Sequence, residues 1–164
     1  MTARIEFSVG LVAGLRAERE VTAACEEAMG AADIKAPAFG PHEPVIATID
    51  VYRPLPDSRQ RCVRSEPDTF KPDAVSEAKL VIDALTGVAW ADDAQVVDLH
   101  VRKHPRVRGQ AERMDVTIAP GWHFHFWGDV NGDTPRYGAT MSRDGETFEC
   151  DYDCMFGAGF DDIH

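Results

Sequence analysis

The stretch Asp83–Lys103, DALTGVAWADDAQVVDLHVRK, carries the most informative pattern in this chain of 164 residues. Its first part ends a helical pattern at Gly87, and residues 97–102 alternate apolar with polar side chains. Apolar residues at every second position are typical of a β-strand with one buried face. The stretch therefore predicts the end of a helix and a strand, joined by a segment that contains the acidic pair Asp92 and Asp93.

The same kinds of pattern extend the prediction in both directions. Pro72 opens the helix that ends at Gly87, because the missing N–H of proline costs nothing in a first turn. Strands are predicted over 3–9, 45–53 and 114–118, and a further helix over 16–30, in which Cys25 packs as a small apolar residue. Residues 104–112 would join the last two strands as a hairpin. These elements predict an α/β (α+β) domain over residues 1–120. The helix opened by Pro72 would bury Val75, Ala78, Val81, Ile82 and Leu85.

Residues 121–164 differ from the rest in composition. They hold nine of the fourteen aromatic residues, and residues 119–164 carry 2 basic against 9 acidic side chains, a net charge of −7. The turn signals Asn131-Gly132 and Asp144-Gly145 separate runs with strand character. We expect a small β-rich appendage packed on the first domain. Its acidic surface either keeps the protein soluble or mimics a phosphate backbone in a basic groove.

The overall composition limits the classes of function. The formal net charge of −11 disfavours contact with nucleic acid unless basic side chains cluster on one face. The apolar runs are too short to span a membrane. Four cysteines at 25, 62, 150 and 154 form no disulfide framework and fit a reducing compartment. We therefore expect a soluble, cytoplasmic protein.

A set of fixed spacings carries a family resemblance. It comprises Lys71-Pro72-Asp73, then Lys79, Asp83-Ala84-Leu85 and the run from Trp90 to Val97. These residues resemble the RusA family of Holliday-junction resolvases, the crossover junction endodeoxyribonucleases. The resemblance implies a mixed sheet with two main helices and Mg²⁺-dependent cleavage of branched DNA, with Mn²⁺ as a substitute. It also implies a homodimer, which suits a substrate with two-fold symmetry.

The resemblance also implies the site residues. Asp73 and Asp93 would be catalytic metal ligands, Asp92 would assist them, and Lys79 would contact the phosphate or the leaving group. Carboxylate oxygens are the ligands that Mg²⁺ prefers, and the ion would neutralise the phosphate and generate hydroxide. We expect the carboxylates from the helix start and from the strand entry to converge on one ion.

The chain departs from the family pattern at the helix start. Val75 and Ser76 stand where the family has a second acid and an asparagine. Glu77 lies four residues beyond Asp73 on the same helix face, so it is either a compensating metal ligand or a surface glutamate. The family's basic stretch is also missing from residues 10–15. Two functions follow: an endonuclease impaired by Val75, or an inactive binding protein of phage or mobile-element origin. The second would inhibit a host nucleic-acid defence complex through its acidic surface.

Two further groups of residues have alternative interpretations. Four cations near the expected hairpin tip either contact DNA phosphates or form a solvated surface. These cations are Arg102, Lys103, Arg106 and Arg108. Two histidines and two cysteines of the appendage either hold zinc or have ordinary structural roles. These residues are His123, His125, Cys150 and Cys154.

Overall fold

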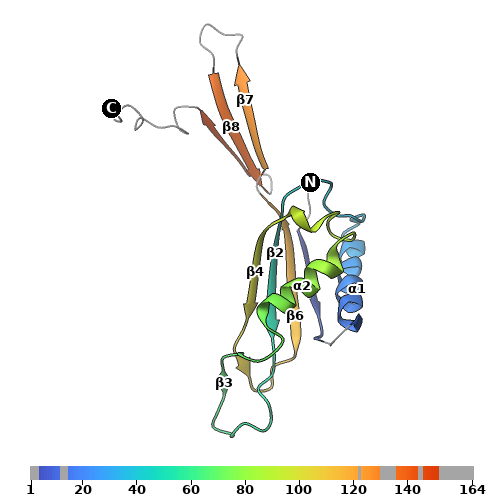
Figure 1. The fold of residues 1–164 in the computed structure, drawn as a ribbon, viewed down its shortest axis with the longest axis vertical. Coiled ribbons are helices and arrows are strands. Elements are labelled where there is room, and N and C mark those ends of the chain that lie inside the picture. Colours follow the sequence, from blue (N-terminus) through green and yellow to red (C-terminus); the bar gives the residue numbers. More distant parts are fainter. Residues whose placement is uncertain (1–3, 12–14, 122, 130–135, 144–145, 152–164) are drawn as a thin grey trace, which may run out of the picture. The chain divides into compact units, whose positions relative to one another are not determined.

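The computed structural model describes residues 4–11, 15–121, 123–129, 136–143 and 146–151 (Figure 1). The chain divides at Pro120 into two compact units. That the second unit packs on the first stays a prediction. Within the described residues, no helix is both long and apolar enough to cross a membrane.

The first unit is a four-stranded mixed sheet with two helices on one face (Figure 1), so the predicted fold class is confirmed. The strand order is β1-β6-β2-β4; β6 runs antiparallel to both of its neighbours, and β2 and β4 run parallel. The elements in chain order are β1 (Ile5–Val9), α1 (Leu15–Ala31), β2 (Val45–Tyr52), β3 (Ser65–Glu66), α2 (Ala74–Leu85), the 3₁₀ helix η1 (Asp93–Gln95), β4 (Val96–Lys103), β5 (Arg106–Val107) and β6 (Arg113–Pro120).

The predicted hairpin over residues 104–112 is wrong. β2 lies between β4 and β6, and it pairs with both. β2 buries every second side chain completely, and its core-facing Ala47, Ile49 and Val51 form the centre of the sheet. Residues 104–112 instead contain β5, which pairs with β3 as a separate two-stranded ribbon.

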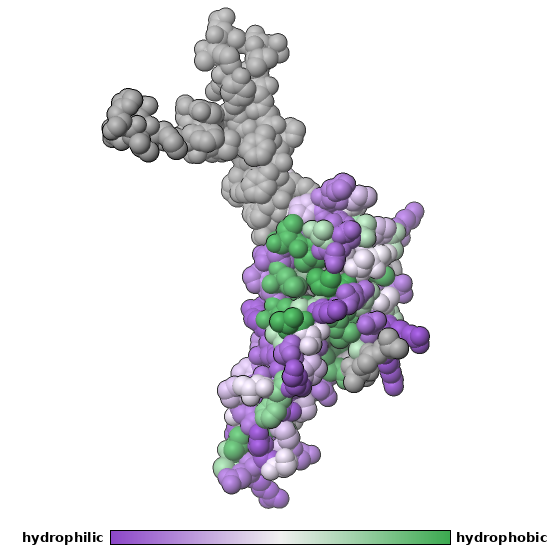
Figure 2. Space-filling model, in the orientation of Figure 1, coloured by the Kyte–Doolittle hydropathy of each residue, from purple (hydrophilic) through white to green (hydrophobic). Residues whose placement is uncertain are grey.

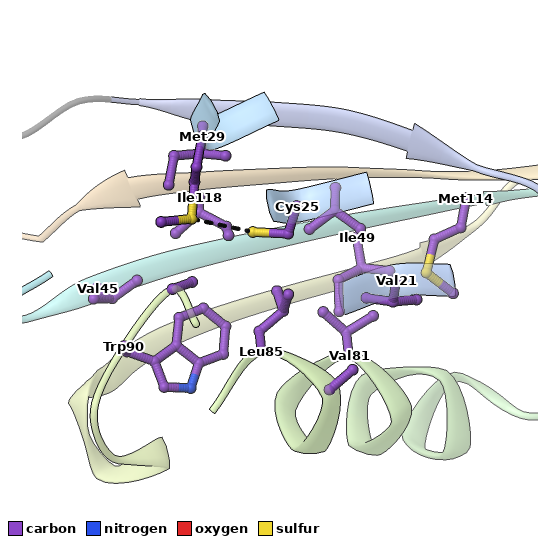
Figure 3. Packing of buried hydrophobic residues seen from close by; sticks show 14 of the residues in the cluster. Val21, Cys25, Met29, Val45, Ile49, Val81, Leu85, Trp90, Met114 and Ile118 are labelled. Carbon is purple, nitrogen blue, oxygen red and sulfur yellow. Dashed lines mark hydrogen bonds between the residues drawn. The ribbon is translucent and has the colours of Figure 1, made fainter. Parts of the chain in front are cut away.

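The core fills the space between the sheet and the two helices (Figure 3). Cys25 of α1 is fully buried there, as predicted, and so is Trp90. Burial raises the pKa of the Cys25 thiol to about 11, so this side chain stays neutral and apolar in character.

The buried face of α2 differs from the prediction. The helix begins at Ala74, with Asp73 as its N-cap, and it buries Glu77, Val81, Ala84 and Leu85. Val75 is 78% exposed, so its place in the buried stripe is wrong. The apolar pattern alone could not show that a charged residue takes the buried position in the first turn.

The connection between β2 and β4 determines where the predicted site residues lie. Because these strands run parallel, α2 must run back along the sheet between them. The start of α2 therefore lies at the carboxyl ends of β2 and β4, whereas Asp92 and Asp93 precede the amino end of β4 (Figure 1).

The second unit contains β7 (His123–Asp129), β8 (Arg136–Arg143) and β9 (Glu146–Asp151), paired antiparallel in that order. This pairing confirms its predicted β-rich character. The turns at 131–132 and 144–145, Cys154, and the side chains of His123, His125 and Cys150 lie outside the described residues. The zinc hypothesis therefore stays a prediction.

Candidate active site

Asp73 caps the start of α2. Its Oδ1 accepts a hydrogen bond of 2.8 Å from the Ser76 backbone N–H, and Lys71 Nζ lies 3.2 Å from Oδ2. The hydrogen bonds from Ser76, with a further one from Lys71, lower the pKa of Asp73 from 3.8 to about 2. The carboxylate is therefore ionised at neutral pH, and it is exposed to solvent.

A groove of about 610 Å³ lies beside the first turns of α2, on the side of the helix that faces α1. Lys79, expected to contact a phosphate, is exposed and lines this groove. The other charged side chains of the lining are mixed in sign, so the groove provides local cations without a uniform positive field. They are Glu18, Arg53, Lys71, Glu77, Asp83, Arg106 and Glu112.

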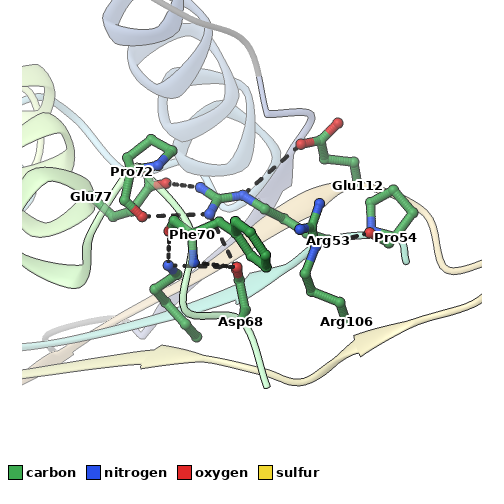
Figure 4. A network of polar contacts seen from close by, with 9 residues as sticks. Arg53, Pro54, Asp68, Phe70, Pro72, Glu77, Arg106 and Glu112 are labelled. Atoms are coloured by element: carbon green, nitrogen blue, oxygen red, sulfur yellow. Dashed lines mark hydrogen bonds and ion pairs between the residues drawn. The ribbon is translucent and has the colours of Figure 1, made fainter. Parts of the chain in front are cut away.

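A buried charge network fixes the start of α2 to the end of β2 (Figure 4). Arg53 donates to Glu77 of α2 and, over 3.1 Å, to Asp68 of the loop before it. Lys103 lies 3.6 Å from the second oxygen of Asp68, and all four side chains are largely buried. Two cations thus offset two carboxylates away from water, an arrangement that tolerates no missing member.

Glu77 has the role of an internal ion-pair partner. It is only 3% exposed, so the surface-glutamate alternative is wrong. Burial raises the pKa of Glu77, against the lowering effect of Arg53. One of its oxygens is bonded to Arg53, so the structure gives Glu77 a function in holding α2 against β2. That Glu77 binds a metal ion stays a prediction, and its hydrogen bond with Arg53 does not favour it.

Asp92 and Asp93 lie at η1, where a capping box shapes the backbone. Asp92 Oδ1 accepts a hydrogen bond of 2.8 Å from the Ala94 N–H, whereas Asp93 is exposed. Gln95 is buried, and sequence reasoning missed its role. Its Oε1 accepts from the backbone N–H groups of residues 91 and 92, and its Nε2 donates to the carbonyls of residues 40 and 43. The Asp-x-x-Gln spacing was the available signal.

Replacing Gln95 by alanine is expected to lower the unfolding free energy by about 1–3 kcal/mol, because buried backbone groups lose their partners. Chemical denaturation measures this change. Asp93→Ala, which removes an exposed side chain of the same 3₁₀ helix, serves as the control and should change stability little. Equal stability of the Gln95→Ala variant and the wild type would contradict the structural role of Gln95.

The structure does not bring Asp73 and Asp93 together within one chain. They lie at opposite ends of β4, whose eight residues span roughly 26 Å at the usual rise of a strand. Within the described residues, no group of three or more His, Cys, Asp or Glu side chains could hold a metal ion. The expectation that these carboxylates converge within one chain is therefore corrected.

Three of the four predicted DNA-contacting cations hold loops in place. Lys103 and Arg106 donate to the backbone carbonyls of Phe70 and Pro54, and the Arg106 guanidinium lies 4.8 Å from the centre of the Phe70 ring. Arg102 is exposed and pairs with Asp50 over 3.0 Å. Arg108 donates to the carbonyls of residues 59, 60 and 63. DNA contact by these residues stays a prediction.

The fold and the helix-capping acid define a class of protein: a small mixed-sheet α+β domain with an exposed, ionised carboxylate at a helix start. The family of Endodeoxyribonuclease RusA matches residues 14–119. The chain therefore belongs to the RusA family, as predicted. This is a family of Holliday-junction resolvase-type endonucleases, which generally depend on a divalent metal and act as dimers.

A curated relative shares part of this sequence. An uncharacterized protein, YqaN of Bacillus subtilis (strain 168), is 40% identical over 76 residues, which cover 39% of this chain. The matched part makes up 54% of that relative, so the chain spans about half the length of the relative that it matches.

Proposed function

We propose that the protein is an endonuclease that cleaves branched DNA, with the Holliday junction as its substrate. Membership of the RusA family over residues 14–119 is the observation that carries this proposal. The exposed and ionised Asp73, beside a groove lined by Lys71 and Lys79, supports it further. An anionic scissile phosphate would bind these two lysines, and Asp73 would lie beside it.

The two-stranded ribbon of β3 and β5 supports DNA binding as well. It brings together basic residues from two loops, although the chain as a whole is acidic. Local clustering of cations is what an acidic protein needs in order to contact phosphates. The cations of these two loops are Arg59, Arg61, Arg64, Lys71, Arg106 and Arg108, and Arg102 and Lys103 lie at the end of β4, just before the second loop.

Mg²⁺, with Mn²⁺ as a substitute, is the cofactor that the family implies, and the described residues of one chain fit it poorly. Val75 has no donor atom, and Glu77 is bonded to Arg53. Asp73 is separated from Asp92 and Asp93 by the length of β4. Among the described residues of a single chain, these side chains therefore do not together form a metal site.

A catalytically inactive RusA-like protein is the alternative. The exposed Val75 at the family's second acid and the net charge of −7 over residues 119–164 favour it. Such a protein, of phage or mobile-element origin, would bind a basic surface of a host nucleic-acid defence complex. Recovery of such a complex, together with its release by charge reversal in residues 144–162, would support this alternative.

The test is cleavage of a synthetic four-way junction by the purified protein. With Mg²⁺ or Mn²⁺ we expect symmetric nicks near the branch point, no cleavage of linear duplexes that contain the same arms, and complete loss of cleavage with a chelator. An absence of cleavage with either metal across the neutral pH range would reject the enzyme and favour the binding protein.

A further inference from the structure

Phe70 is an exposed aromatic side chain in the loop that leads into α2. It is 44% exposed, whereas the other aromatic side chains that the structure describes are buried or half-buried. The surface around β3, at the lower end of the view in Figure 2, is mostly hydrophilic and has only small apolar areas. Phe70 does not belong to the hydrophobic core, so core packing does not account for its position.

The backbone of Phe70 is held on both sides by the buried charge network. Its N–H donates to Asp68 Oδ1 over 3.4 Å, and its carbonyl accepts a hydrogen bond from Lys103 Nζ. The side chain of Asp68 is completely buried, and that of Lys103 is 11% exposed. The ring therefore projects from a fixed backbone, which reduces the ordering cost when a ligand binds to it.

Two guanidinium groups lie at the ring of Phe70. The Cζ atom of Arg106 lies 4.8 Å from the ring centre (Figure 4), and that of Arg59 lies 5.9 Å from it. Both distances are within the range of cation–π interactions. Arg106 also donates to the carbonyl of Pro54 over 3.1 Å, and Arg59 pairs with Glu66 over 2.9 Å. We define the Phe70 platform as Phe70, Arg59 and Arg106.

The Phe70 platform lies close to the candidate active site. Phe70 precedes Asp73 by three residues, which span at most about 11 Å of chain. Arg106 lines the groove that also contains Lys71 and Lys79. Successive nucleotides of one duplex strand rise about 3.4 Å along the helix axis. A phosphate beside Asp73 and a base on Phe70 would therefore be separated by roughly three nucleotides or fewer.

We propose that Phe70 stacks on a nucleobase that has left the base stack at the branch point, while Arg59 and Arg106 contact the phosphates on either side of it. The proposal rests on the proposed function and names the part of the branched substrate that the site recognises. Every base has a π face, so an aromatic ring with neighbouring arginines binds an unstacked base of any sequence. A single apolar ring in a hydrophilic surface is too small an area for a protein partner.

Such a contact favours branched over linear DNA. In a linear duplex each base is paired and stacked, and its removal from the stack costs free energy. This cost is least for a base that is already unpaired or unstacked. The branch point interrupts the stack, so a base there reaches Phe70 at a lower cost. Phosphate contacts alone cannot provide this selectivity, because they are available along any duplex.

The first experiment compares binding of the full chain to a synthetic four-way junction and to a linear duplex of one of its arms, with a chelator present so that neither is cleaved. Phe70→Leu should bind the junction about 5- to 150-fold more weakly, as expected for one stacked base, and should bind the duplex like the wild type. Phe70→Tyr keeps the ring and should bind normally. Val107→Ala, which removes another exposed apolar side chain of the β3–β5 ribbon, is the matched control and should have no effect. Thermal unfolding checks that the variants are folded.

The salt dependence separates stacking from an indirect effect on the two arginines. Phe70→Leu removes no charge, so the logarithm of its affinity should fall with the logarithm of salt concentration at the wild-type slope. Arg59→Met removes one phosphate contact and should reduce the size of this slope by about 1. A smaller slope for Phe70→Leu would overturn the proposal, since the ring would then act by holding the arginines in place.

A photochemical link tests the contact in the unaltered protein. 5-Iodouracil placed within about three nucleotides of the branch point should form a link with the peptide that contains Phe70, as identified by mass spectrometry. The same base in the linear duplex should not. Links to other peptides alone would overturn the proposal. So would unchanged junction binding by Phe70→Leu, an equal loss on the linear duplex, or a wild type that does not bind the junction.

These measurements distinguish the stacking contact from the enzymatic function. A wild type that cleaves the junction, with binding unaffected by Phe70→Leu, would reject the stacking contact and leave the enzyme intact. Junction binding and a photochemical link that both depend on Phe70, in a protein that cleaves with neither Mg²⁺ nor Mn²⁺, would reject the enzyme and support the stacking contact in a binding protein.

Discussion

Replacing Arg53 by methionine is expected to lower the unfolding free energy by about 3–5 kcal/mol, as for other buried ion pairs that lose one partner. Arg53 is the main cation that offsets Glu77 and Asp68, and each carboxylate is almost completely buried. Methionine has a similar length and an apolar stem, so the change isolates the loss of the guanidinium. Urea denaturation at pH 7 measures the effect.

The loss of unfolding free energy in Arg53→Met should depend on pH in a defined direction. Burial already raises the pKa of Glu77 in the folded wild type, while Arg53 opposes the rise. Without Arg53 the folded-state pKa must rise further, so the folded state binds a proton at pH values where the unfolded chain has lost it. Stability then falls as the pH rises between the unfolded and folded pKa values. The deficit relative to the wild type should therefore be smaller near pH 5 than at pH 8.

Two comparisons identify the cause. Arg16→Met removes an arginine whose pair with Glu20 is exposed, and such pairs contribute about 0–1 kcal/mol. The double variant Arg53→Met/Glu77→Met removes both the cation and one orphaned carboxylate, so it should recover part of the loss. A deficit in Arg53→Met no larger than that of Arg16→Met would contradict a stabilising role for the network.

Periodicity predicted the helices and main strands of the first unit. It did not predict which strands lie side by side in the sheet. Alternation over 97–102 and 114–118 identified two strands, and their closeness in sequence suggested a hairpin. The insertion of β2 between them depends on long-range pairing that a local pattern does not contain. Glu77 shows the same limit, because its burial depends on Arg53, 24 residues earlier in the chain.

The separation of Asp73 from Asp93 could have been deduced from the sequence with one further step. A helix that connects two parallel neighbouring strands must start at their carboxyl ends. A strand–helix–strand order over 45–103 therefore places Asp73 and Asp93 at opposite ends once β2 and β4 are taken as parallel. The choice between parallel and antiparallel pairing was the missing information, and only the structure supplied it.

Asp73→Asn is expected to lower the rate of junction cleavage by about 10²–10³, since loss of one charged group at a phosphoryl-transfer site removes several kcal/mol of transition-state stabilisation. Stability should stay close to the wild-type value, because asparagine caps a helix as well as aspartate does. The substitution therefore separates the chemistry of the carboxylate from its capping of α2. Single-turnover cleavage and thermal unfolding measure the two effects.

Asp73→Ala and Glu26→Gln complete this comparison. Alanine removes both the charge and the cap, so cleavage and thermal stability should fall together. Glu26→Gln removes one negative charge from an exposed position of α1 and should change neither property. Because the pKa of Asp73 is about 2, its carboxylate stays ionised in neutral and mildly acidic solution, so a pH dependence of cleavage there must come from another group. Wild-type cleavage by Asp73→Asn would remove Asp73 from the site and leave its function as the cap of α2.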